Sequence, residues 1–202
     1  MMNKDILICG VGGQGTVLAS KIIAAAASAE GSLIHSTETI GMAQRGGSVT
    51  SHVRIGENAL SPLIPFGNAD LLLAFEPAEA VRNLKYLRKD GVAIVNTVAT
   101  KPVTDSLNDT GYDGSEMTEY IRGKCSGIFV DSDRVCAPFG SIRFFNIIIL
   151  GIAAGSGKMG ISQATLLDQI EARVPKKYVE INKKAFQTGF DIGQESRAEQ
   201  IN

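Results

Sequence analysis

A run of small residues near the N-terminus has the composition of a loop that binds an anion. Its members are Gly10, Val11, Gly12, Gly13, Gln14 and Gly15. Because glycine has no Cβ, this backbone can turn tightly and approach a ligand closely. The spacing of Gly10, Gly12 and Gly15 matches the fingerprint with which α/β folds meet the diphosphate of a dinucleotide. The run therefore predicts recognition of a phosphate group, and Gln14 adds an amide that can reach a ligand or a neighbouring subunit.

The segments on either side of this run place it where such a loop works. Residues 6–9 are predicted to form a buried strand, and residues 16–30 an amphipathic helix. The first free N–H groups of that helix, beginning at Thr16, would point at the ligand, and the helix dipole favours an anion there. The alternative is a glycine turn that only packs the helix against the sheet, without a ligand.

A second polar segment, residues 35–47, follows the next predicted strand at residues 33–35. Its candidate ligand-binding residues, with the serine that follows, are Gln44, Arg45, Gly46, Gly47 and Ser48. A guanidinium can bind a phosphate or carboxylate through two parallel hydrogen bonds while neighbouring glycines let the backbone come close. The segment is expected at the edge of the crevice where open α/β sheets bind ligands. The alternative is a surface loop in which Arg45 pairs with a carboxylate such as Glu38.

Glu38 is the acidic residue of this segment. In nicotinamide-binding folds an acidic residue after the second strand accepts hydrogen bonds from the ribose hydroxyls. Glu38 lies late for that position, and Ser36 and Thr37 stand at the predicted strand end itself. A helix-capping or ion-pairing role is therefore favoured for Glu38.

Composition argues against several other chemistries. The net charge of −1 gives no electrostatic reason to expect a nucleic acid or an anionic membrane as partner. Cys9, Cys125 and Cys136 have no CxxC spacing, which disfavours a disulfide framework, an iron–sulfur cluster or a zinc site. His35 and His52 are the only histidines, too few for a His-based metal site. The N-terminus lacks a signal-peptide pattern, and a cytoplasmic protein is expected.

Two further stretches are given structural interpretations. Residues 155–159 lack the phosphate-loop pattern because Met159 stands where Ser or Thr is required, so a glycine turn at a helix end is expected. The longest apolar run, residues 147–154, is too short to cross a bilayer.

Strands and helices alternate along the chain. Strands are predicted at residues 6–9, 33–35, 47–55, 71–75, 92–95 and 128–130, and helices at 16–30, 77–90, 116–122, from 141, between Ser162 and Pro175, and at 178–193. This order predicts an α/β fold, with a Rossmann-like open, mainly parallel sheet and helices on both faces. With 202 residues and 44% hydrophobic content, we expect one domain spanning residues 1–202. Helices from about residue 141 should pack on the same core, and the tail after about 193 should be mobile.

The two glycine-containing segments together resemble a known family. The runs GVGGQG at residues 10–15 and GMAQRGGSV at 41–49 are similar to the gamma-type subunits of 2-oxoacid:ferredoxin oxidoreductases, and within them to the beta subunit of indolepyruvate ferredoxin oxidoreductase. The later matches are Gly140, Asn146, Leu150 and Gly151. Ser141 departs from the pattern, since many members carry asparagine there. The resemblance covers roughly residues 4–190.

This resemblance implies a subunit of an enzyme that converts a 2-oxoacid and coenzyme A into an acyl-CoA, carbon dioxide and reduced ferredoxin. In that family, thiamine diphosphate with Mg²⁺ and the iron–sulfur clusters sit on other subunits or domains. We therefore expect no catalytic residue in this chain and no activity of the chain alone. The implied partner is a large or alpha-type subunit bearing thiamine and iron–sulfur centres, with ferredoxin reached through the complex. Coenzyme A is the ligand expected at the glycine loop.

Two rival functions stay open at this stage. One is a stand-alone NAD(P)- or FAD-dependent oxidoreductase that uses the glycine loop conventionally, and the other is a non-catalytic assembly subunit. Leu63, Ile64 and Phe66, in a proline-bounded loop, are expected to need covering, which predicts a partner subunit or a homodimer of the isolated chain. Phe144 and Phe145 are expected in the core instead.

Overall fold

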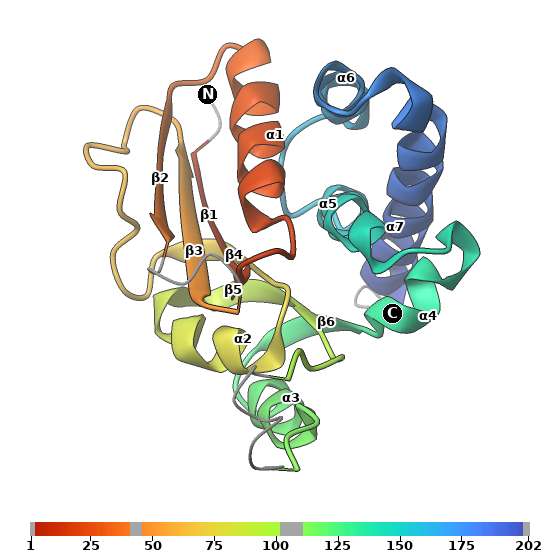
Figure 1. The fold of residues 1–202 in the computed structure, drawn as a ribbon. Helices are drawn as coiled ribbons and strands as arrows, with labels where there is room; N and C mark the ends of the chain where they lie inside the picture. The colour runs from red at the N-terminus through yellow and green to blue at the C-terminus, as the bar shows by residue number, and fades with distance from the viewer. Residues whose placement is uncertain (1–2, 41–45, 102–110, 200–202) are drawn as a thin grey trace.

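A mixed sheet with helices on both faces forms the centre of the chain (Figure 1). The computed structural model describes residues 3–40, 46–101 and 111–199. Its strands are β1 (Lys4–Val11), β2 (Ile34–Ile40), β3 (Ser48–Ile55), β4 (Ala69–Ala74), β5 (Leu87–Asn96) and β6 (Ser126–Val130). They form one 6-stranded sheet in the order β2-β3-β1-β4-β5-β6. The predicted α/β class, with an open and mainly parallel sheet, is confirmed.

The direction of β3 sets the surroundings of the glycine loop. β1, β4, β5 and β6 are parallel neighbours, whereas β3 runs antiparallel to both β1 and β2. Val11 at the end of β1 therefore pairs with Ser48 at the start of β3. The two segments singled out in the sequence consequently meet at the same edge of the sheet.

The second strand is longer than predicted. β2 extends to Ile40, so Ser36, Thr37 and Glu38 lie within the strand and pair with β3 instead of following the strand end. β2 is an edge strand with many exposed polar positions, so its sequence lacks the apolar alternation that would have revealed it. The expectation that residues 35–40 line the crevice beyond a strand is therefore wrong.

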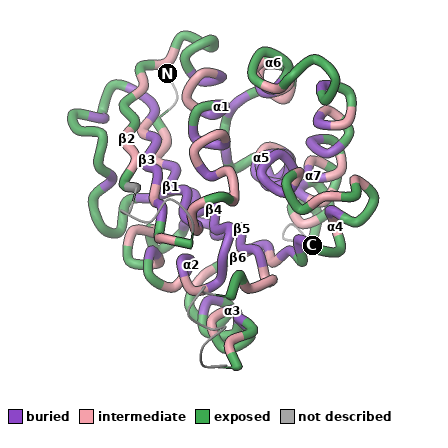
Figure 2. Tube along the Cα trace, viewed as in Figure 1, coloured by how far each residue is buried: buried purple, intermediate pink, exposed green. Residues whose placement is uncertain are grey.

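Four helices lie on one side of the sheet. α1 (Thr16–Ala29) and α5 (Phe145–Gly155) pack against it, with α6 (Gln163–Arg173) and α7 (Val179–Glu199) outside them (Figure 1). α5 is apolar on nearly all sides and is buried along its length (Figure 2). One hydrophobic cluster contains side chains from β1, β4, β5, α1 and α5. The C-terminal helices thus share the core of the sheet.

α5 and α7 touch through their backbones. A Cβ added at Gly151 or Gly155 would lie 2.1 or 2.0 Å from a backbone oxygen of α7, and one added at Gly189 or Gly193 would lie 2.0 or 2.3 Å from a backbone oxygen of α5. No side chain fits at this crossing, so all four positions require glycine. α7 also continues to Glu199, beyond the predicted end at residue 193.

The other face of the sheet carries α2 (Pro77–Asn83) and α3 (Ser115–Arg122). Pro77 begins α2 as predicted, but the helix ends at Asn83, and a 3-10 turn (Leu84–Tyr86) leads directly into β5. The prediction of a helix through residue 90 is wrong because Leu87, spaced like a helical core residue, instead pairs with Ala69 of β4.

Short helical segments follow β6. α4 (Ser132–Cys136) and the 3-10 turns Ala137–Phe139 and Ile142–Phe144 lead into α5, and α4 has no counterpart in the sequence prediction. Ser162 caps α6 as predicted, by accepting the Thr165 N–H at 3.1 Å.

Among the described residues no single helix is both long and apolar enough to cross a membrane, and one bent pair, Ser132–Phe139 with Ile142–Gly155, passes by length and composition alone.

Candidate functional site

The glycine loop links the end of β1 to the start of α1. Gly13 has a φ of +104° and Gly15, the N-cap of α1, a φ of +86°, a region that side chains with a Cβ rarely adopt. A Cβ at Gly15 would also lie 2.6 Å from Nδ2 of Asn146 on α5. Glycine is therefore needed at both positions to form the turn and to let α5 approach α1.

Some N–H groups of the loop already have protein partners. The Gly12 N–H donates to the Gly47 carbonyl at 2.8 Å, and the Gly46 N–H donates to the Gly12 carbonyl at 3.3 Å. The Val11 N–H donates to Oε1 of Gln14 at 2.8 Å. Within the described part of the chain, the N–H groups of Gly13, Gly15 and Thr16 donate to no protein acceptor. An anion at this loop would therefore bind at residues 13–16, where the helix dipole also favours it.

Gln14 ties the loop to two other strands. Its Nε2 donates to the Phe75 carbonyl at 3.1 Å and to the Thr100 hydroxyl at 3.0 Å, while its Oε1 receives the Val11 N–H. The end of β1 and the segments that follow β4 and β5 are thus joined through one amide. Gln14 positions the loop in this structure, and its polar atoms are engaged internally, unlike the free amide that the sequence suggested.

The second predicted segment lies beside the glycine loop. Gly46 and Gly47 hydrogen-bond with Gly12, and Ser48 follows them. The Ser48 hydroxyl donates to Oε2 of Glu79 at 2.6 Å, so it connects the segment to α2. Gln44 and Arg45 lie outside the described residues. The structure therefore brings together Gly10 to Thr16 with Gly46, Gly47 and Ser48.

Two buried carboxylates at the start of α2 were missed by the sequence analysis. Glu76 and Glu79 are 2% and 1% exposed. Glu76 caps α2 by accepting the Glu79 N–H at 3.0 Å and also accepts the Tyr112 hydroxyl, while Glu79 pairs with Arg82. Burial, then the hydrogen bond to Glu76 and the charge of that carboxylate, raise the pKa of Tyr112 well above its usual value. The spacing of two glutamates around Pro77 was the available signal, since it is typical of a capped helix start.

These carboxylates lie near the first cysteine. Burial, followed by the charges of Glu79 and Glu76, raises the pKa of the Cys9 thiol well above its usual value. Burial, followed by Asp133, raises the pKa of Cys136 to about 11. Both thiols therefore stay protonated near neutral pH and are poor metal ligands. No cluster of three or more His, Cys, Asp or Glu side chains suited to a metal ion occurs in the described ranges.

A cleft of about 590 Å³ opens at the carboxyl ends of β1, β4 and β5. The glycine loop forms one wall, and α4 with the Ile142–Phe144 turn and the start of α5 forms the other. Asn96 joins the two sides, because its Nδ2 donates to the Phe75 carbonyl at 3.0 Å and its Oδ1 accepts the Ser132 N–H at 3.2 Å. Asn96 and Ser132 were not predicted, although Asn96 stands at a strand end, where such sites form.

The walls of the cleft combine apolar and polar groups. Phe75 and Phe145 meet edge to face at 5.8 Å between ring centres, and Val98 and Ile142 also line the cleft. Arg143 lines it as an exposed side chain and has no ion-pair partner in the described segments. An elongated ligand with an anionic group and an apolar portion fits this lining.

Glu38 has a different environment from the one considered in the sequence. It lies in β2 and accepts a hydrogen bond from the Ser20 hydroxyl of α1 at 3.0 Å. It is not among the residues that line the cleft. Glu38 therefore neither faces the cleft, as a ribose-binding residue would, nor caps a helix.

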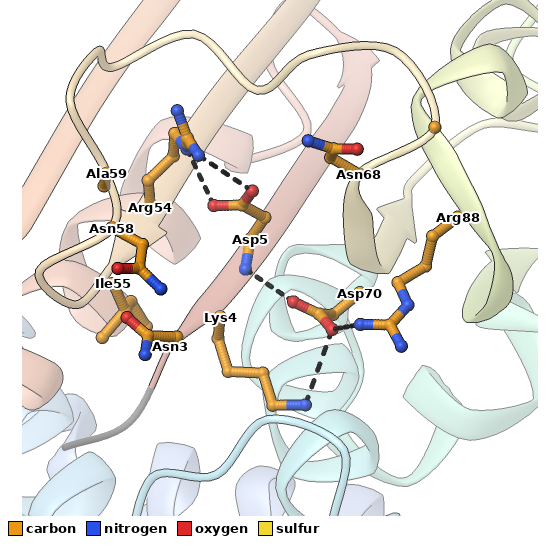
Figure 3. A pocket seen from close by; sticks show the side chains of 11 residues that line it. Asn3, Lys4, Asp5, Arg54, Ile55, Asn58, Ala59, Asn68, Asp70 and Arg88 are labelled. Atoms are coloured by element: carbon orange, nitrogen blue, oxygen red, sulfur yellow. Dashed lines mark hydrogen bonds and ion pairs between the residues drawn. The ribbon is translucent and has the colours of Figure 1, made fainter.

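A second, polar cleft of about 330 Å³ lies at the opposite edge of the sheet (Figure 3). Arg54 binds the Asp5 carboxylate through two nitrogens, at 2.8 and 3.3 Å. Asp70 accepts the Asp5 N–H at 2.9 Å and pairs with Arg88 at 2.6 Å and Lys4 at 3.8 Å. Because these charges pair with one another, they hold together the amino ends of β1 and β4 and the carboxyl end of β3.

Comparisons with known proteins agree with the sequence resemblance. The family model of pyruvate ferredoxin/flavodoxin oxidoreductase matches residues 5–192. Indolepyruvate oxidoreductase subunit IorB of Archaeoglobus fulgidus is 36% identical over 192 residues, which cover 94% of this chain and 95% of that protein.

Solved structures share the fold. The gamma subunit of a keto/oxoacid ferredoxin oxidoreductase from Geobacter sulfurreducens matches with a TM-score of 0.69 and 26% identity, over 95% of this chain and 99% of that one. A 2-oxoglutarate:ferredoxin oxidoreductase from Magnetococcus marinus, solved with 2-oxoglutarate, coenzyme A and succinyl-CoA bound, matches with a TM-score of 0.73 and 18% identity. The match covers 96% of this chain and 32% of that longer one. The family model and the relatives match the chain over nearly its whole length, including both glycine segments. The chain therefore belongs to the pyruvate ferredoxin/flavodoxin oxidoreductase family.

Proposed function

We propose that this chain is the small subunit of an indolepyruvate-type 2-oxoacid:ferredoxin oxidoreductase and that it contributes the coenzyme A site. The observation that carries the proposal is that the two glycine segments meet at one cleft, which Gly12, Gly13 and Gly46 line. Beside it, the N–H groups of Gly13, Gly15 and Thr16 have no acceptor among the described residues. The indolepyruvate assignment is supported by the name of the 36% identical relative.

The lining of the cleft suits the parts of coenzyme A. The diphosphate would lie at the start of α1, where backbone N–H groups and the helix dipole favour an anion. The apolar surfaces of Val98, Ile142 and Phe145 would contact the pantetheine arm, and Arg143 at the rim would supply a further cation. Arg45 is proposed to contribute in the same way.

Thiamine diphosphate with Mg²⁺ and the iron–sulfur clusters are proposed to reside on a partner subunit. The buried, protonated thiols of Cys9 and Cys136 do not fit a cluster-ligating role. In the assembled enzyme those groups would supply decarboxylation and electron transfer to ferredoxin. This chain would bind and orient the acyl acceptor, and a cytoplasmic location is part of the same proposal.

The sheet order argues against the stand-alone nicotinamide enzyme. In a dinucleotide-binding fold, a parallel strand beside β1 ends in the acidic residue that holds the ribose. Here the neighbour is the antiparallel β3, and Gly46 and Gly47 occupy the space beside Gly12. Glu38 lies on the edge strand and is bonded to Ser20.

The test is a comparison of the isolated chain with the complex co-expressed with a thiamine-binding partner. The complex should reduce a viologen dye with indolepyruvate only when coenzyme A is present, and the isolated chain should not. Turnover by the isolated chain, supplied with thiamine diphosphate, Mg²⁺ and coenzyme A, would refute the proposal. A complex that forms but needs no coenzyme A would favour the assembly-subunit rival.

A further inference from the structure

No side chain from α1 itself caps its first N–H groups or offsets the positive end of its dipole. Its N-cap is Gly15, which has no side chain to accept a helix N–H, and its first turn contains no acidic residue. The positive end of the dipole of this helix, which runs from Thr16 to Ala29, is therefore unopposed by these local means.

A buried amide from another helix lies over this position. Asn146, in the first turn of α5, is 9% exposed. Its Nδ2 lies 2.6 Å from where a Cβ of Gly15 would stand, and its Cγ 3.2 Å from the same point. The absence of a side chain at Gly15 is what lets the amide lie against the start of α1.

The Asn146 amide has no hydrogen-bond partner in the described parts of the chain. The oxygen and nitrogen of this amide are not completely enclosed by the protein, so both keep some surface that a ligand can reach. A buried amide without a partner is costly, and such groups are usually satisfied. A donor that is left unpaired beside unpaired backbone N–H groups is the arrangement expected of a site that awaits an acceptor.

We infer that the Asn146 side chain is a ligand-binding group that donates a hydrogen bond to a phosphate oxygen held at the start of α1. This inference rests on the proposed coenzyme A site and assigns to its diphosphate a donor from α5. The phosphate is bound by Nδ2 of Asn146 together with the N–H groups of Gly13, Gly15 and Thr16. A diphosphate from another nucleotide shares this chemistry, so the experiment includes one.

The decisive variant is Asn146→Asp, made in the co-expressed complex. The carboxylate has nearly the same shape and is favourable beside the helix N-terminus, so thermal stability should be kept or rise. The same carboxylate repels a bound phosphate, so coenzyme A affinity should fall by roughly tenfold to a hundredfold. A merely structural role would not move stability and affinity in opposite directions. Asn58→Asp, the same change in an exposed loop, should alter neither.

Equilibrium titrations of coenzyme A, NAD and inorganic pyrophosphate separate the outcomes. Unchanged coenzyme A affinity in Asn146→Asp would overturn the inference and leave the proposed function standing. Binding of NAD or pyrophosphate but not coenzyme A by the unmodified complex, with the same loss in Asn146→Asp, would support the phosphate contact and refute the coenzyme A assignment. No binding of any of the three would refute both.

A second pair of variants applies if Asn146→Asp does not assemble. Asn146→Ser keeps a short neutral donor, whereas Asn146→Leu removes hydrogen bonding at similar volume. The serine variant should bind coenzyme A more tightly than the leucine variant in complexes of equal thermal stability. Equal affinities would contradict the inference.

Discussion

Gln14 is the residue on which the shape of the glycine loop depends most. Its single amide accepts the Val11 N–H and donates to the Phe75 carbonyl and the Thr100 hydroxyl. Each of these bonds joins the loop either to itself or to a neighbouring strand end. The residue was singled out in the sequence for a polar atom that could reach outward, and the structure uses it to hold the loop.

Gln14→Glu should loosen the loop. The carboxylate still accepts from Val11 but cannot donate, and it would face the Phe75 carbonyl oxygen. We expect the free energy of unfolding to fall by about 1–3 kcal/mol, and coenzyme A affinity to fall with it. Urea unfolding and ligand titration measure the two effects. Gln194→Glu, an exposed position on α7, is the matched control. Equal stability of the two variants would show that the hydrogen bonds of Gln14 do not stabilise the fold.

His52 makes stability depend on pH. It is buried, and its Nδ1 accepts the Ile64 N–H at 3.2 Å. Burial first, and then the charge of Arg54, lower the pKa of His52 below 6.5, and Asp5 opposes this in part. The unfolded chain therefore binds the proton at a higher pH than the folded chain does. The stabilisation is present above pH 6.5 and is lost as pH falls through the folded pKa.

Unfolding at about pH 7.5 and about pH 5.5 tests this assignment. The unmodified chain should be less stable at the lower pH, and His52→Gln, which can still accept from Ile64, should show a smaller difference. His35→Gln, on the exposed edge strand, should keep the full difference. An unchanged pH dependence in His52→Gln would contradict the assignment.

At the scale of elements, the crossing of α5 and α7 depends on its glycines. Gly189→Ala would place a Cβ 2.0 Å from the Ile148 carbonyl oxygen, so the helices must separate. The cost should be about 1–3 kcal/mol or more of the free energy of unfolding. Gly123→Ala is the control, because its Cβ would be 3.6 Å from the nearest atom and its φ is −77°. That change should be neutral or slightly stabilising. Similar losses in both variants would show that the crossing has no special packing.

Sequence patterns predicted the elements whose burial is periodic. β1, α1, β3, α3, β6 and the capped α6 were recognised from apolar spacing and from Ser162. The predicted range of the edge strand β2 was too short because the polar residues of that strand hide its alternation. The predicted range of α2 was too long because Leu87 has helical spacing. The crossing of α5 and α7 is a tertiary contact between distant glycines, so no local pattern could reveal it.

Some residues of the candidate site could likewise be predicted from the sequence, and others could not. Its glycine loop and the residues Gly46 to Ser48 could be found because their signal is local. Asn96 and Ser132 could not, because their importance arises where strand ends and helix starts meet. Asn146 was named only as part of the family resemblance, and the position of its amide over Gly15 is a tertiary contact that no local pattern shows. The roles of Gln44 and Arg45 remain predictions, because they lie outside the described residues.

At the scale of the whole molecule, exposed apolar side chains gather between β3 and β4. Leu60 is 93% exposed, Leu63 55% and Phe66 65%, whereas Ile64 is 2% exposed and belongs to the core. The expectation that Ile64 needs covering is therefore wrong, and Leu60 joins the candidate interface. Of the two phenylalanines expected in the core, Phe145 is buried and Phe144 is half-buried against it.

This surface predicts self-association of the isolated chain. Exposed apolar residues of this kind are often covered by a partner, and a lone chain would most readily form a two-fold dimer. Light scattering at micromolar concentration should show a dimer that Leu63→Ser with Phe66→Ser converts to a monomer. A monomeric unmodified chain that also fails to bind a co-expressed thiamine-binding subunit would count against the complex.

The most direct measurement of the central claim is coenzyme A binding by the assembled enzyme with and without an intact glycine loop. Gly12→Val can keep the backbone bonds to Gly46 and Gly47 but adds a branched side chain at a residue that lines the cleft. The unmodified complex should bind coenzyme A, and Gly12→Val should lose that binding while its melting temperature changes little. Coenzyme A affinity that survives in Gly12→Val, or that is absent from the unmodified complex, would contradict the assignment of the site.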